Sequence, residues 1–243
     1  MSRCLLLLLL YCLSAPAFAR VASVDVSAQV QVIREGKLKQ GQGGGSSSGS
    51  GDVVVWLVPL SASTGSAADP LPSTTPEHFR MVQKDKTFTP HLLVVPTGST
   101  VDFPNLDPFF HNVFSLFNGK RFDLGLYEAG STRTVHFDHE GVSYIFCNIH
   151  PEMSAVIIAL STPYTGVSSP DGSITLHSVP PGMYEMKVWA EGSDARQLDT
   201  LNRRVRISPT QRDLGVLRIV EAGTPAHKNK FGEDYNPAAP PLY

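Results

Sequence analysis

The stretch Cys147-Asn148-Ile149-His150-Pro151-Glu152-Met153 places a thiol, an imidazole and a thioether at intervals of three residues. All three are soft or borderline metal donors, and a stretch this short holds them in one tight loop. A mononuclear copper site of the blue type uses two His and one Cys in a trigonal plane, with a weak axial Met. The stretch therefore supplies every ligand of such a site except one His, which another part of the chain must provide.

The start of the chain predicts export. A basic residue within 1–3 precedes an unbroken leucine run over 5–10, and Ala17-Phe18-Ala19 has the A-x-A form of a cleavage site. We therefore expect residues 1–19 to be a signal peptide, and the mature protein to be periplasmic or extracellular. No later stretch is apolar over the ~20 residues that a membrane-spanning helix needs, so the sequence predicts no membrane span.

Removal of the signal peptide would leave a single cysteine. Cys4 and Cys12 would be lost with it, and Cys147 would stay. In an oxidising compartment a lone thiol has no internal disulfide partner. A buried, inert thiol is the simpler explanation, but His150 and Met153 at fixed spacing beside Cys147 favour metal binding.

The composition is typical of a globular protein rich in strands. Hydrophobic residues make up 42% and charged residues 17% of the 243, and the formal net charge is -2. This balance favours neither nucleic acid nor an anionic membrane surface as a partner. The 20 Gly and 19 Pro, together with frequent Val, Thr and Ser, predict strands joined by turns. The length allows one large or two modest domains.

Hydrophobic patterns predict strands in three blocks. Residues 24–32 alternate apolar and polar side chains, whereas 53–58 are apolar throughout, which is typical of a strand buried on both faces. A Gly- and Ser-rich run, 41–51, separates them. The middle block predicts strands over residues 86–95, 99–103, 133–137, 142–147 and 154–160, with no long amphipathic helix. The last block predicts strands over 173–177, 183–189, 203–207 and 214–220.

The missing imidazole is predicted at His111. This residue follows the strand over 99–103 and a loop rich in Pro, Asn and Asp. In a β-sandwich, strands that are far apart in sequence end at the same pole, so loops after different strands converge there. The predicted metal ligands are therefore His111, Cys147, His150 and Met153.

Other metal sites fit the sequence less well. His136 and His139 are spaced to lie on opposite faces of a strand, and the remaining histidines are isolated. The lack of His-x-His and His-Cys-His motifs argues against a multicopper oxidase or a copper nitrite reductase, and the lack of Cys-x-x-x-Cys against a binuclear copper centre. Zinc could bind Cys and His, but Met is a poor zinc ligand.

Two motifs resemble the cupredoxin family of type 1 copper proteins. The first is Val101-x-Phe103-x-Asn105-x-Asp107 leading to His111-Asn112, and the second is Cys-x-x-His-x-x-Met. The short spacing of the second motif, with Pro151 directly after the His, is most similar to amicyanin. The resemblance covers residues 77–161 and implies a Greek-key β-sandwich.

The resemblance also implies a role for each matching residue. Imidazole nitrogens of His111 and His150, the thiolate of Cys147 and a weak axial Met153 would bind one copper. Asn112 would tie the two ligand loops together by hydrogen bonds. Phe109, Phe110 and Phe114 could form an apolar patch around the site or fill the core.

A second resemblance lies in the last block. Asp-Gly-x-x-x-Leu, followed by Val-Pro-Pro-Gly-x-Tyr-x-x-x-Val-Trp, resembles the carboxypeptidase-regulatory-like, transthyretin-like sandwich, and residues 22–62 have the form of its opening strands. We therefore expect an all-β chain in which residues 22–62 and 162–221 form one sandwich, with the cupredoxin inserted in it or fused to it. Residues 222–243 are expected to be a disordered tail. The combination resembles exported proteins described as methylamine-utilisation-like, a label that defines no function.

Four protein ligands would leave copper no open position for a substrate. The sequence therefore predicts a one-electron carrier and not an enzyme, with electrons passing through His150 to a redox partner protein. Two alternatives stay open: copper storage, delivery or sensing with a second sandwich that docks a partner, and a structural adhesion module. The sequence identifies neither the partner nor the oligomeric state.

Overall fold

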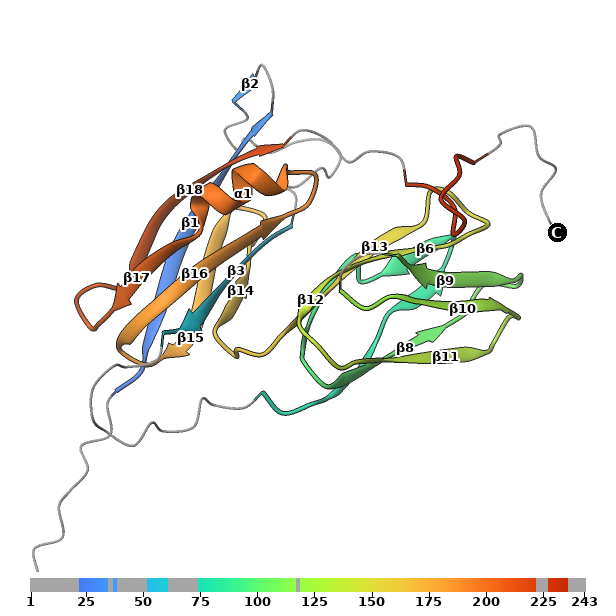
Figure 1. The fold of residues 1–243 in the computed structure, drawn as a ribbon, viewed down its shortest axis with the longest axis horizontal. Coiled ribbons are helices and arrows are strands. Elements are labelled where there is room, and N and C mark those ends of the chain that lie inside the picture. The colour runs from blue at the N-terminus through green and yellow to red at the C-terminus, as the bar shows by residue number, and fades with distance from the viewer. Residues whose placement is uncertain are drawn as a thin grey trace, which may run out of the picture.

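The computed structural model describes residues 22–34, 37–38, 52–60, 74–116, 119–221 and 227–235. The predicted signal peptide, residues 1–19, and the run 41–51 lie outside the described residues. The described residues form two β-sandwiches placed end to end (Figure 1), so the all-β fold class predicted from the sequence is confirmed. No helix in these ranges has the length and apolar composition needed to cross a membrane.

One sandwich combines strands from both ends of the chain. Its first sheet has the order β15 (Ser173–Val179), β1 (Val24–Arg34), β18 (Asp213–Glu221), with β2 (Lys37–Leu38) paired to β1. Its second sheet has the order β14 (Thr165–Val167), β3 (Val53–Pro59), β16 (Gly182–Ala190), β17 (Arg203–Ile207). Because β3 pairs with β14 and β16, the chain leaves this sandwich after β3 and returns to it at β14.

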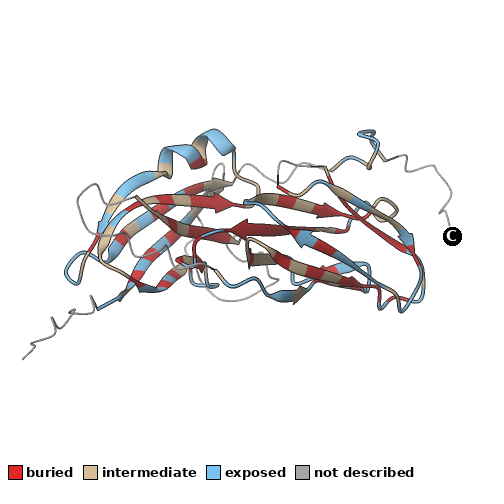
Figure 2. Ribbon diagram, turned by 60° about the horizontal axis from the view of Figure 1, so that its bottom comes forward, coloured by how far each residue is buried: buried red, intermediate tan, exposed pale blue. Residues whose placement is uncertain are grey.

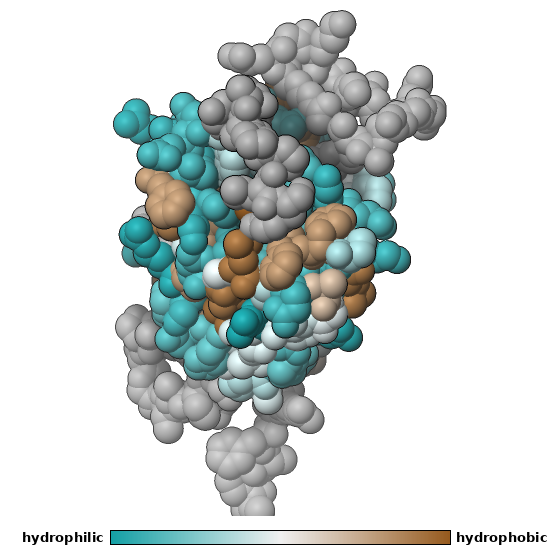
Figure 3. Space-filling view, turned by 90° about the vertical axis from the view of Figure 1, so that its right-hand side faces the viewer, coloured by the Kyte–Doolittle hydropathy of each residue, from teal (hydrophilic) through white to brown (hydrophobic). Residues whose placement is uncertain are grey.

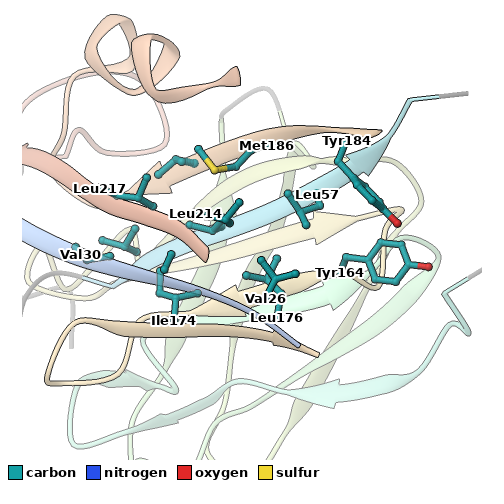
Figure 4. Close-up of a cluster of buried hydrophobic side chains, with 14 of the residues drawn as sticks. Val26, Val30, Leu57, Tyr164, Ile174, Leu176, Tyr184, Met186, Leu214 and Leu217 are labelled. Carbon is teal, nitrogen blue, oxygen red and sulfur yellow. The ribbon is translucent and has the colours of Figure 1, made fainter. Parts of the chain in front are cut away.

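The two faces of β3 explain its unbroken apolar sequence. Val53, Val55 and Leu57 point into the core between the two sheets, among side chains such as Val26, Ile174 and Leu217 (Figure 4). Val54, on the other face, packs with Trp189 against the second sandwich. The sequence-based interpretation of 53–58 as a strand buried on both faces is confirmed.

The second sandwich is built from the middle block. One sheet has the order β10 (Phe122–Tyr127), β9 (His111–Ser115), β12 (Gly141–Phe146), β13 (Ser154–Leu160), β7 (Leu92–Pro96). The facing sheet has the order β11 (Thr132–Phe137), β8 (Ser99–Pro104), β4 (His78–Arg80), and β5 (Val82–Lys84) forms a hairpin with β6 (Thr87–Thr89). The predicted strand 86–95 is interrupted between β6 and β7, because Pro90 has no backbone N–H to continue a ladder.

An apolar contact joins the sandwiches. Val156, Ile158 and Leu160 of β13 pack against Val54 and Trp189. The Trp189 Nε1–H also donates to the Tyr144 hydroxyl over 3.4 Å. One face of the β13 sheet is therefore covered by the other sandwich, and the far end of the second sandwich, where β12 ends, stays free for a site.

The short helix α1 (Ala195–Leu201) was not predicted. Asp194 caps it by accepting a hydrogen bond from the Arg196 N–H, and Leu198 is its buried residue. One apolar anchor gives no helical periodicity to detect, and most of α1 is exposed (Figure 2). The expectation of a disordered tail is wrong for residues 227–235, which pack against the second sandwich through Tyr235, Lys230 and His227.

A His–Glu pair at the junction predicts pH-dependent stability. The His91 Nε2 lies 2.8 Å from Glu191 Oε2 in the other sandwich. The hydrogen bond to Glu191 raises the pKa of His91, against the opposing effect of burial. A raised His pKa stabilises the fold at pH values below its unfolded pKa, ~6.5, and this stabilisation is lost as pH rises through the folded pKa. Glu191→Gln should therefore lower the thermal midpoint at pH 5.5 more than at pH 8.5.

The control is the same substitution in a His91→Gln background. There the effect of Glu191→Gln on the thermal midpoint should not change with pH, because the titrating partner is gone. An equal effect of Glu191→Gln at both pH values in the otherwise unchanged protein would contradict the prediction.

Candidate metal centre

Strand pairing brings the predicted ligands together. His111 begins β9, and Cys147 directly follows β12. Because β9 and β12 are antiparallel neighbours, the start of one lies beside the end of the other. His150 and Met153 lie in the turn between β12 and β13, which is closed by Met153 N–H to His150 O (3.0 Å) and Cys147 N–H to Met153 O (3.3 Å).

Three donor atoms form a tight triangle. The Cys147 Sγ lies 3.7 Å from the His111 Nδ1 and 3.6 Å from the His150 Nδ1. The two Nδ1 atoms are 3.1 Å apart. Bonds of roughly 2.0–2.3 Å from nitrogen and sulfur to one ion would place trigonal donors about 3.5–3.8 Å apart. The two sulfur–nitrogen distances match this range, and the shorter 3.1 Å between the two Nδ1 atoms corresponds to an angle of about 100° at an ion with bonds of that length. The triangle therefore fits a single metal ion in a distorted trigonal arrangement, and Met153 is buried in the same core cluster as Cys147.

The protonation state of the two imidazoles favours metal binding. Burial lowers the pKa of His111, against the opposing effect of the Asp107 carboxylate, and burial and the neighbouring His111 lower the pKa of His150. Both imidazoles are therefore neutral near pH 7. Burial raises the pKa of the Cys147 thiol, but the backbone N–H groups of Asn112, Ile149 and His150 act in the opposite direction. The net effect is a raised pKa, so the thiol must release its proton when a metal binds, and the three N–H groups then stabilise the thiolate that binds it.

Asp107 is a functional residue that sequence reasoning missed. Its Oδ2 lies 2.8 Å from the His111 Nε2, and the two side chains are 5% and 0% exposed. The N–H groups of Asp85 and Lys86 donate to the same carboxylate over 2.7 and 3.0 Å. Burial alone would raise the pKa of Asp107, but these three donors outweigh it and the pKa is lowered.

The charged carboxylate fixes the tautomer of His111. With Nε2–H donating to Asp107, the Nδ1 lone pair is left for a metal, an arrangement common around metal-binding histidines. Asp107 stands four residues before His111 and belongs to the first motif. Nothing in the sequence distinguished it from the other turn-forming residues of that loop.

Asn112 lies between the two ligand loops, as the cupredoxin resemblance implies. Its Nδ2 donates to Asp123 Oδ1 (2.7 Å) and to Gly125 O (2.9 Å). Its Oδ1 accepts from the Asn148 N–H over 3.3 Å. A single side chain thus connects β9, β10 and the loop that follows Cys147.

The three phenylalanines near His111 differ in their surroundings. The Phe109 ring lies 5.2 Å from the His111 ring and 5.5 Å from the His150 ring. Phe110 is exposed (42%), and so are Leu106 (54%) and Leu126 (48%). Phe114 is fully buried. Apolar side chains gather on this end of the molecule (Figure 3). Phe114 is therefore a core residue, and Phe109 and Phe110 belong to an apolar surface beside the half-buried His150.

Other histidines of the described ranges have partners away from this triangle. His78 pairs with Asp102, His136 with the Gly98 carbonyl and His139 with Asp138. Within the ranges that the structure describes, the His, Cys, Asp and Glu side chains close enough to share a metal ion are His111, Cys147 and His150.

Proteins similar to part of this chain are found among solved structures. No protein-family profile matches the sequence, and no curated protein matches it. Among solved structures, a purple cupredoxin from Nitrosopumilus maritimus is 25% identical over 33% of this chain and 98% of its own, with a TM-score of 0.30. A point mutant of amicyanin in its reduced state is 19% identical over 37% of this chain and 96% of its own, with a TM-score of 0.32.

A copper-containing nitrite reductase, NirK from Thermus scotoductus, is 24% identical over 42% of this chain and 25% of its own, with a TM-score of 0.32. Part of this chain is thus similar to cupredoxins. All three TM-scores are low, so the case for copper comes from the side chains of this chain and the distances between them.

Proposed function

We propose that this chain is an exported type 1 copper protein that carries single electrons to a redox partner. The observation that supports it best is the triangle of one sulfur and two Nδ1 atoms, with sides of 3.1–3.7 Å. A thiolate and a thioether favour Cu(I), and imidazole serves both oxidation states. Bound copper would supply the Cu(II)/Cu(I) couple. Export rests on the leader sequence of residues 1–19.

The surroundings of the ligands suit transfer of electrons better than turnover of a substrate. His111, Cys147 and Met153 are at most 1% exposed, and these residues with His150 would occupy the whole ligand set. His150 is half-buried and lies against Phe109. The exposed Leu106 and Phe110 give this end an apolar surface on which a partner could dock. Electrons would leave through the imidazole edge of His150.

Titration of the metal-free protein with Cu(II) tests the proposal. An electron carrier should bind one copper per chain, develop an intense thiolate-to-copper band in the visible region, and show a reversible one-electron wave. Copper binding without the band and the wave would favour storage, delivery or sensing. No binding at all would leave a structural role.

A further inference from the structure

The C-terminal segment crosses from one sandwich to the other. The strand β18, which precedes it, belongs to the sandwich of β1 and β15. Residues 227–235 nevertheless lie on the second sandwich (Figure 1), where Tyr235 contacts the Cys147 carbonyl. A short polar segment that docks so far from its own strand must be held by specific contacts, because fixing its backbone costs conformational entropy.

Those contacts converge on the residues around the thiol ligand. The Tyr235 hydroxyl donates to the Cys147 carbonyl over 3.0 Å. The Lys230 backbone N–H donates to Asn148 Oδ1 over 2.9 Å. The His227 ring stacks on Phe146, with ring centroids 4.1 Å apart and planes at 17°. Three consecutive residues, 146–148, are thus each held by a different residue of the segment.

A salt bridge joins the segment to the hydrogen bonds of Asn112. The Lys230 Nζ lies 2.9 Å from Asp123 Oδ2, and the other oxygen of that carboxylate accepts from Asn112 Nδ2. The segment is therefore connected both to the loop that carries Cys147 and to the residue that bridges the two ligand loops.

The segment has an inner and an outer side. His227, Lys230 and Tyr235 are half-buried, whereas Phe231 is 73% exposed. The Tyr235 hydroxyl also lies 3.4 Å from the His227 Nδ1, so the two inner rings support each other.

We propose that residues 227–235 are a clamp that closes the thiol side of the metal centre, with Tyr235 and Lys230 as positioning residues for the Cys147–Met153 loop. The metal that the loop holds rests on the proposed function, but the clamp does not need the metal to be present. It keeps the ligand loop in its binding conformation, so less ordering is required when a metal enters. It also holds closed the loop in which the Cys147 thiol is buried, and reagents and oxidants that attack the thiolate reach it when that loop opens.

The rate at which a small maleimide alkylates Cys147 in the metal-free full-length protein tests the clamp. The double variant His227→Ala/Tyr235→Ala should react roughly tenfold faster, since loss of a hydrogen bond and a ring contact shifts local opening by about that factor. Tyr235→Phe, which removes the hydroxyl alone, should react at an intermediate rate. Lys228→Ala, an exposed position in the same segment, is the matched control and should react like the wild type. An unchanged rate in the double variant would overturn the clamp.

Hydrogen exchange separates local opening from general loss of stability. The backbone amides of residues 147–153 should exchange faster in the double variant, while those of β16 in the other sandwich should not change. Faster exchange both in residues 147–153 and in β16 would mean that the segment stabilises the whole protein. The proposal that it acts as a clamp on the Cys147–Met153 loop would then be wrong. Copper release to a chelator should also be about tenfold faster in the double variant than in Lys228→Ala. If copper gives no blue site, the proposed function fails, and the alkylation rates still decide on the clamp.

Discussion

Replacement of Cys147 by serine is expected to abolish the visible band of the copper-loaded protein. The band requires a thiolate bound to copper, and a serine hydroxyl is neither soft nor ionised near pH 7. Copper affinity should fall by more than the ~10–100-fold that loss of a residue supporting a ligand costs. The fold should persist, because serine is small and the N–H groups of Asn112, Ile149 and His150 that face the sulfur can donate to its oxygen. Absorption spectra at one copper per chain and thermal unfolding of the metal-free protein measure the two effects.

Met153→Leu is the matched control for this prediction. Leucine fills a similar buried volume, and the variant leaves the triangle of Cys147, His111 and His150 intact. It should therefore keep an intense band while its reduction potential changes, since the axial ligand tunes the potential. A band that survives in Cys147→Ser would show that the colour does not come from this thiolate, and the proposed copper site would then be wrong.

The candidate ligands could be selected from the sequence because their signal is local and chemical. Cys147, His150 and Met153 are donors at short spacing. Residues this close in sequence stay close in space whatever the rest of the fold is. The strand 154–160 was predicted with the bounds that β13 has, because its apolar run is continuous and is bounded by the ligand loop. His111 required one further step, the convergence of strand ends at a pole, and the antiparallel pairing of β9 with β12 provides it.

The supporting residues could not be predicted, because their roles depend on distant parts of the chain. Asp107 is one acidic residue in a turn until Asp85 and Lys86 come within hydrogen-bonding distance of its carboxylate. Tyr235 stands in a polar, Pro-containing tail, where composition indicates disorder. Its docking becomes visible only once the Cys147 carbonyl lies beside it. Periodicity and composition describe a segment by itself and carry no information on such contacts.

Asp107→Ala is expected to destabilise the metal-free protein by roughly 1–3 kcal/mol, the usual cost of leaving buried hydrogen-bond donors without their acceptor. The change leaves the His111 Nε2–H and the N–H groups of Asp85 and Lys86 without their acceptor. Copper affinity should also fall about 10–100-fold, because His111 loses the partner that fixes its tautomer. Urea unfolding and competition with a copper chelator measure the two losses.

Asp102→Asn provides a control with similar local chemistry but a different environment. Asp102 pairs with the His78 Nε2 over 2.7 Å, but the two side chains are 22% and 61% exposed. Such a surface pair should contribute less than ~1 kcal/mol, and its loss should leave copper affinity unchanged. A similar loss of stability from both substitutions would contradict the role assigned to burial.

The pH dependence of Asp107→Asn tests the charge of this carboxylate. Because the folded pKa of Asp107 is lowered, its charge stabilises the fold at pH values above the unfolded pKa, ~3.9. This stabilisation is lost as pH falls through the folded pKa. The difference in unfolding free energy between wild type and Asp107→Asn should therefore shrink as pH falls below about 5. A difference that does not depend on pH would mean that Asp107 supports His111 through shape alone, and its charge would then have no part in preparing the Nδ1 for copper.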